Sequence, residues 1–183
     1  DLPGYGQTTP QAAADEPSVG YTAELIEALV GDVGAPAVLA GHSYGGVVAL
    51  AVALRGRVPV GALVLLEPVA VPVLSMAGDA DTYAKTQAVF RDYIASVEAG
   101  NPGTIRTMVD FWFGDGTFER MPEATTAGLR QAAPANARDV RATFRETYDA
   151  GAFRSLPMPV VTVVGDRSPD VTRRIASAIA THA

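Results

Sequence analysis

The amino-acid sequence predicts an α/β protein built on a parallel sheet, with an inserted region made only of helices. Two apolar runs, 37–41 and 61–66, are separated by a helical pattern, and a third run, 160–164, precedes another helix. The order of strand, turn, helix and strand is typical of parallel sheets with right-handed crossovers. The long stretch between the second and third runs has helical periodicity and no comparable strand pattern.

The composition excludes several functional classes. The 183 residues are 48% hydrophobic and 19% charged, as in folded globular proteins, and carry a net charge of −6 without any Lys/Arg block. We therefore expect neither nucleic acid nor an anionic membrane surface as a partner. No apolar run reaches the roughly 18 residues of a membrane span.

The chain contains no cysteine, which excludes disulfides, thiolate catalysis and Cys-type zinc sites. This composition fits the reducing cytoplasm, which is the location we expect. A segment upstream of Asp1 could still carry an export signal.

The N-terminal part is predicted to be a loop followed by one helix. Glycines and prolines mark residues 1–18 as a loop. Ser18 is a typical N-cap, and apolar residues recur at helical spacing over 19–31. Either Gly31 or Gly34 is expected to end this helix.

Two strand–helix steps and a final helix complete the predicted core. The run 37–41 is short and continuously apolar, which predicts a strand buried on both faces. A helix rich in Ala, Val and Leu is expected over 47–54, a second strand over 61–66 and a third over 160–164. A helix over about 169–181 follows.

The region between the second and third strands is predicted to be a helical cap. Apolar residues share one helical face in three stretches, 80–98, 104–112 and 136–150. This region is far longer than a crossover requires. We therefore divide the chain into a core of 1–68 and 157–183 and a cap of 69–156.

One motif, Gly41-x-Ser43-x-Gly45, points to chemistry because it lies between a predicted strand and a predicted helix. A serine in such a tight turn adopts an unfavourable backbone conformation and projects its hydroxyl from the sheet edge, while the neighbouring chain segments approach so closely that only small residues fit. The backbone N–H of Tyr44 could then stabilise an oxyanion. The alternative is a nucleotide-binding turn, but neither a P-loop lysine nor a GxGxxG motif is present.

Two motifs make the sequence resemble the α/β-hydrolase superfamily, in particular its members with a helical cap between the sixth and seventh strands. They are Asp1-x-x-Gly4-x-Gly6-x-Thr8, with threonine where serine is usual, and Gly41-His42-Ser43-Tyr44-Gly45-Gly46. The resemblance implies a partial α/β-hydrolase fold with Ser43 as the nucleophile. It also implies that the first four strands, the loop with the second oxyanion donor and the eighth strand lie outside these residues.

Neither histidine of the chain suits the general base that this resemblance implies. The triad order in the family is serine, acid, histidine. His42 lies within the turn beside Ser43. His182 ends the last helix, where the negative end of the helix dipole stabilises a solvated histidine. We expect the catalytic histidine beyond Ala183, so the chain alone should hydrolyse little.

The identity of the acid is open at this point. Many relatives have aspartate three residues after the glycine that ends strand seven, and here that position is Ser168. Glu67, at the end of the second strand, and Asp166 are alternative acids, and a third possibility is that neither serves. Their structural alternatives are a loop cap for Glu67 and a turn residue for Asp166.

Trp112 and Phe113 could line an acyl or aryl pocket under the cap, although aromatic clusters more often pack in a core. The sequence thus predicts a serine hydrolase that cleaves an ester, amide or C–C bond of a small hydrophobic substrate through an acyl-enzyme on Ser43. No metal or cofactor is implied. The alternatives are a non-catalytic small-molecule-binding protein, or an acyltransferase or perhydrolase that uses the same serine.

Overall fold

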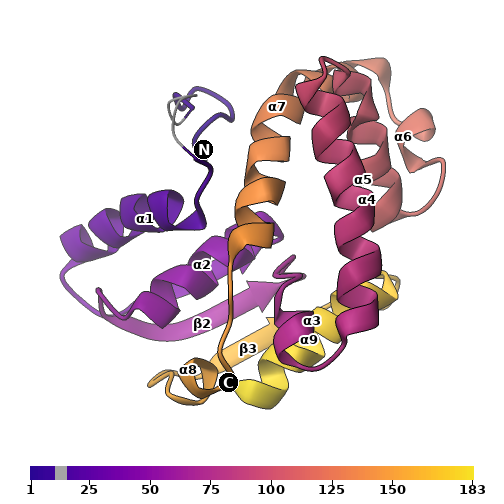
Figure 1. The fold of residues 1–183 in the computed structure, drawn as a ribbon. Helices are drawn as coiled ribbons and strands as arrows, with labels where there is room; N and C mark the ends of the chain where they lie inside the picture. Colours follow the sequence, from indigo (N-terminus) through magenta and orange to yellow (C-terminus); the bar gives the residue numbers. More distant parts are fainter. Residues whose placement is uncertain (11–15) are drawn as a thin grey trace.

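The computed structural model describes residues 1–10 and 16–183. Within these residues, three strands form one parallel sheet in the order β1 (Ala37–His42), β2 (Val60–Leu66) and β3 (Val160–Val163). Helix α2 (Tyr44–Arg55) packs against β1 and β2, and α9 (Asp170–His182) packs against β3 (Figure 1). The predicted α/β class with a parallel sheet is therefore confirmed.

Helix α1 (Val19–Val33) begins and ends where local chemistry allows. The Ser18 hydroxyl accepts a hydrogen bond from the Gly20 N–H at 3.1 Å, as expected of an N-cap. Gly34 ends the helix with φ of 68°, a conformation that glycine adopts without a Cβ clash, so the helix runs past Gly31. The predicted loop holds no helix or strand over residues 1–10 and 16–18, and its residues 11–15 lie outside the described ones.

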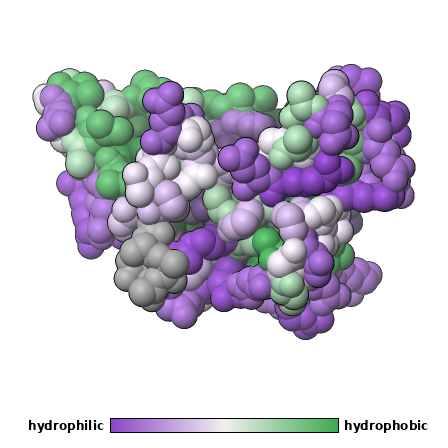
Figure 2. Space-filling view, turned by 90° about the horizontal axis from the view of Figure 1, so that it is seen from above, coloured by the Kyte–Doolittle hydropathy of each residue, from purple (hydrophilic) through white to green (hydrophobic). Residues whose placement is uncertain are grey.

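The expectation that the first strand, over 37–41, is buried on both faces is wrong, and the third strand is half exposed as well. Leu63 and Leu65 of β2 are fully buried, whereas Val38, Val161 and Val163 are 67%, 52% and 44% exposed. Burial alternates because helices cover one face of the sheet, which is the pattern of a half-covered sheet. Figure 2 shows hydrophobic surface (green) mainly along one side of the molecule.

All regular secondary structure between β2 and β3 is helical. Two long helices, α4 (Ala80–Glu98) and α7 (Glu123–Arg145), lie against each other and extend away from the sheet (Figure 1). The shorter elements are α3 (Val73–Met76), the 3-10 helix η1 (Pro102–Thr104), α5 (Ile105–Phe113), α6 (Thr117–Arg120) and α8 (Ala150–Arg154). The division into core and cap at 68 and 157 remains our prediction.

One cap helix departs from its predicted bounds. The pattern over 136–150 predicted a helix there, but α7 begins at Glu123 and ends at Arg145, and α8 follows as a separate short helix. Pro134 lies inside α7, where its exposed position lets the helix continue without one backbone hydrogen bond. No helix among the described residues is long and apolar enough to cross a membrane.

Two hydrophobic clusters of buried side chains stabilise the fold. One joins α2, the sheet and α9 and includes Leu50, Phe153 and Ile175, all fully buried. The other lies within the cap and is centred on Phe90 and Tyr93, which are each 1% exposed. The second cluster therefore packs the cap helices against one another.

Candidate active site

Ser43 lies between β1 and α2 in the disfavoured conformation that the sequence predicted, with φ of 54° and ψ of −122°. Its N–H donates to the Leu66 carbonyl at 3.0 Å, and its carbonyl accepts from the Gly46 N–H at 3.0 Å. The hydroxyl makes no capping hydrogen bond to α2. The backbone thus fixes Ser43 at the end of the sheet and leaves its hydroxyl available to a ligand.

The chain segments on either side of Ser43 approach closely, as expected, but only Gly41 must be small for this approach. A Cβ at Gly41 would lie 2.2 Å from the Gly45 carbonyl oxygen, which no side chain tolerates. A Cβ at Gly45 would meet nothing within 4 Å. The reason is that the backbone of Gly45, and not the position of its absent side chain, faces Gly41.

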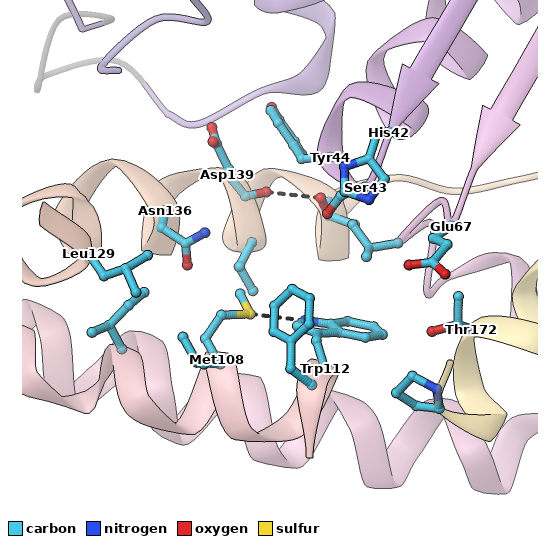
Figure 3. A pocket seen from close by; sticks show the side chains of 17 residues that line it. His42, Ser43, Tyr44, Glu67, Met108, Trp112, Leu129, Asn136, Asp139 and Thr172 are labelled. Atoms are coloured by element: carbon cyan, nitrogen blue, oxygen red, sulfur yellow. Dashed lines mark hydrogen bonds between the residues drawn. The ribbon is translucent and has the colours of Figure 1, made fainter. Parts of the chain in front are cut away.

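A cavity of about 230 Å³ lies between Ser43 and the cap helices α5 and α7 (Figure 3). Its apolar wall includes Val69, Ile105, Met108, Val109, Trp112, Phe113, Leu129 and Val140. Trp112 donates its indole N–H toward the Met108 sulfur at 3.0 Å and stacks on Phe90, while Phe113 is 67% exposed. Trp112 therefore both lines the cavity and packs in the cap core.

Glu67 lines the same cavity and ends β2, the strand next to β1. Its N–H donates to the Val163 carbonyl at 2.8 Å, and its φ of 46° is in the left-handed region. The carboxylate accepts hydrogen bonds from the Ser168 hydroxyl and from the Gly165 N–H, the latter at 2.9 Å. These two donors hold the pKa of Glu67 below its ordinary value.

The other candidate acid, Asp166, lies apart from this cavity. Its side chain is exposed, and it is absent from the residues that surround Ser43. Its carbonyl accepts a hydrogen bond from Arg173 at 2.6 Å, which makes it part of the turn before α9. The structure thus brings Glu67, but not Asp166, to the cavity of Ser43.

The family profile of the α/β hydrolases matches residues 1–183. The chain belongs to the α/β-hydrolase family. Among curated proteins, none is similar enough in sequence to match.

Solved structures of α/β hydrolases share the fold of this α/β-hydrolase chain. An α/β hydrolase from Sphaerobacter thermophilus matches all of the chain with 22% identity and a TM-score of 0.64, over 68% of its own length. MenH from S. aureus matches all of it with 18% identity and a TM-score of 0.69, over 69%. The 2-hydroxy-6-oxo-6-phenylhexa-2,4-dienoate hydrolase of Rhodococcus sp. strain RHA1 matches all of the chain with 17% identity and a TM-score of 0.63, over 66% of its own length. The chain therefore spans about two thirds of these proteins, and at such identities the likeness shows the fold.

A half-buried carboxylate that the sequence analysis missed lies at the cavity margin. Asp139 of α7 accepts a hydrogen bond from the Tyr5 hydroxyl at 2.7 Å. It also interacts with the hydroxyl of Tyr44, which Figure 3 shows in the same region. Burial raises the pKa of Asp139 to about 6. The cluster joins the N-terminal loop, the turn of Ser43 and the cap, and no signal in the sequence pointed to it.

The two histidines lie in different parts of the molecule. His42 is exposed and lines the cavity beside Ser43, and its charge contributes to the lowered pKa of Glu67 (Figure 3). His182 ends α9 and lines a different surface hollow with Leu74 and Arg174. Within residues 1–10 and 16–183, no three His, Cys, Asp or Glu side chains are grouped to hold a metal ion.

Proposed function

We propose that this α/β hydrolase cleaves an ester, amide or C–C bond of a small hydrophobic substrate, with Ser43 as the nucleophile. The observation that carries the proposal is the position of Ser43. It occupies a strained turn between strand and helix and faces an apolar cavity that Glu67 also lines. Backbone strain of this kind is concentrated at functional sites.

In the proposed reaction, the Ser43 hydroxyl attacks the substrate carbonyl carbon and transfers its proton to a histidine. The resemblance implies that this histidine lies outside residues 1–183. The Tyr44 N–H, at the start of α2, donates to the oxyanion that forms. The histidine then gives its proton to the leaving group, and water hydrolyses the acyl-enzyme to release the acid and restore Ser43.

Glu67 is the acid that we assign to this triad. Its carboxylate shares the cavity with Ser43, and its lowered pKa keeps it ionised near neutral pH. An ionised carboxylate can orient the imidazole and stabilise its protonated form. The exposed Asp166 lacks that position.

The apolar lining supports a hydrophobic substrate group. Met108, Trp112 and Leu129 face the space in front of Ser43 (Figure 3). No lysine or arginine is among the described residues that line this cavity. The substrate portion under the cap is therefore expected to be apolar and uncharged.

Labelling of Ser43 tests the proposal in the full-length protein. A fluorophosphonate should modify the wild type, and p-nitrophenyl butyrate should be hydrolysed. Ser43→Ala should abolish labelling and reduce kcat by about 10³-fold or more. Ser177→Ala, an exposed serine of α9, is the matched control and should behave as the wild type.

Two outcomes would overturn the proposal. The first is retention of hydrolysis by Ser43→Ala, which would place the chemistry elsewhere. The second is a wild type that binds small esters in the cavity but neither reacts with the fluorophosphonate nor turns them over. That result would favour the non-catalytic binding protein.

A further inference from the structure

We infer that Ser168 is a positioning residue, which holds one oxygen of the Glu67 carboxylate so that the other oxygen can receive the imidazole N–H of the triad. The inference rests on the proposed function, because it takes Glu67 as the acid. Ser168 itself touches neither substrate nor histidine in this scheme. It acts through Glu67.

The hydrogen bonds to Glu67 are all made at one oxygen. Both the Ser168 hydroxyl and the Gly165 N–H donate to Oε1. Among the described residues, no hydrogen bond is made to Oε2. A carboxylate with one oxygen tied by two donors and the other unoccupied has a defined orientation and a free acceptor.

The donors themselves are fixed by the turn that follows β3. The Ser168 N–H donates to the Gly165 carbonyl at 3.1 Å, which closes the turn. The Arg173 guanidinium donates to the carbonyls of Ser168 and Asp166 and ties the turn to the first part of α9. The turn therefore holds the backbone of Ser168 in place independently of the hydrogen bond to Glu67.

The packing between turn and carboxylate is close. A Cβ at Gly165 would lie 3.1 Å from Glu67 Oε1 and equally 3.1 Å from Ser168 Oγ. Any side chain at Gly165 would thus crowd the contact between the acid and its donor. Glu67 is anchored from the other direction by its own N–H, which pairs with Val163.

The fixed backbone explains why the side-chain donor matters. Glu67 has a positive φ, and its side chain starts from the end of β2 with several rotatable bonds. Without the Ser168 hydroxyl, only the Gly165 N–H would restrain Oε1. The carboxylate would then rotate more freely about the bonds of its side chain.

The test is a double-mutant cycle in the full-length protein with p-nitrophenyl butyrate. Ser168→Ala should lower kcat by about 10- to 100-fold, the loss expected for one hydrogen bond to a charged group. KM should stay within about 2-fold. In a Glu67→Gln background, Ser168→Ala should cause almost no further loss, because both changes disable one unit.

A second measurement reads the acid directly, without activity. The Glu67 carboxyl can be titrated by carbon NMR in the wild type and in Ser168→Ala. Loss of the donor should raise the pKa of Glu67 toward its ordinary value. Ser168→Thr keeps a hydroxyl and should restore most of kcat, and Ser177→Ala should leave both readings unchanged.

The outcomes separate this inference from the function that it rests on. If Glu67→Gln keeps wild-type kcat while Asp166→Asn loses it, Glu67 is not the acid and its assignment fails. If Glu67→Gln is impaired but Ser168→Ala turns over and titrates like the wild type, only the role of Ser168 is overturned. Losses that simply multiply in the double variant would equally overturn it.

Discussion

The half-buried carboxylate of Asp139 should make folding stability depend on pH in a way that one substitution removes. Asp139 interacts with the hydroxyls of Tyr5 and Tyr44 in a half-buried position. Its pKa rises from an ordinary 3.8 to about 6 in the folded protein. The folded state therefore binds a proton more tightly than the unfolded state over this range.

The sign and size of the effect follow from that difference. Because the folded pKa is the higher one, the stabilisation by protonation is full below the unfolded pKa and is lost as the pH rises through about 6. Two pKa units correspond to about 3 kcal/mol in total. Between about pH 4.5 and about pH 7.5, the free energy of unfolding should fall by about 2 kcal/mol from this group alone.

Urea unfolding of the wild type and Asp139→Asn across this pH range measures the effect. Every other titrating group, including Glu146 with its raised pKa, is present in both proteins and cancels in the difference. The wild type should lose about 2 kcal/mol relative to Asp139→Asn as the pH rises. Asp115→Asn, which removes an exposed carboxylate, is the matched control. A constant difference between wild type and Asp139→Asn would refute the reasoning.

Two further substitution pairs test how the core is built. Gly41→Ala should destabilise the fold by about 3 kcal/mol or prevent folding, because its Cβ would collide with the Gly45 carbonyl. Gly45→Ala should raise the free energy of unfolding by up to about 1 kcal/mol, because a Cβ there meets nothing within 4 Å. Thermal unfolding of both variants measures these changes. Arg55→Ala should cost about 2 to 3 kcal/mol in urea unfolding, since it removes the closest partner of Glu27, which is 8% exposed. Lys85→Ala, which breaks an exposed ion pair, should cost less than about 0.5 kcal/mol, and equal losses in the two variants would contradict this account.

The turn of Ser43 was predictable because its signals are local. The apolar run of β1, two glycines and an Ala/Val/Leu helix follow one another directly in the sequence. Each signal reports on the residues beside it, and the disfavoured φ of Ser43 follows from the same motif. The helix over 80–98 was predicted with its observed bounds for the same reason, since its apolar face repeats regularly.

The missed features depend on residues far apart in the chain. The contact of Ser168 with Glu67 spans 101 positions and that of Tyr5 with Asp139 spans 134. No local pattern reports such pairs. The early start of α7 was missed because its first half has few large apolar residues to mark a face and contains Pro134, which normally ends a helix.

Burial of the strand over 37–41 was the other error, and its cause is similar. A continuous apolar run indicates that both faces of a strand can be buried, but not which neighbouring elements cover them. Val38 and Val161 are as apolar as the buried residues of β2, yet among the described residues the helices pack on the opposite face of the sheet. Periodicity thus predicts the kind of element better than its surroundings.

The two residues that we assign to the chemistry are also costly to the fold. Among the described residues, Ser43 and Glu67 are the only non-glycine positions with positive φ, and such conformations cost of order 1–3 kcal/mol each. A library selected only for heat resistance should therefore accumulate glycine at both positions. A library selected for turnover should retain serine and glutamate there and would find its stabilising changes elsewhere in the chain.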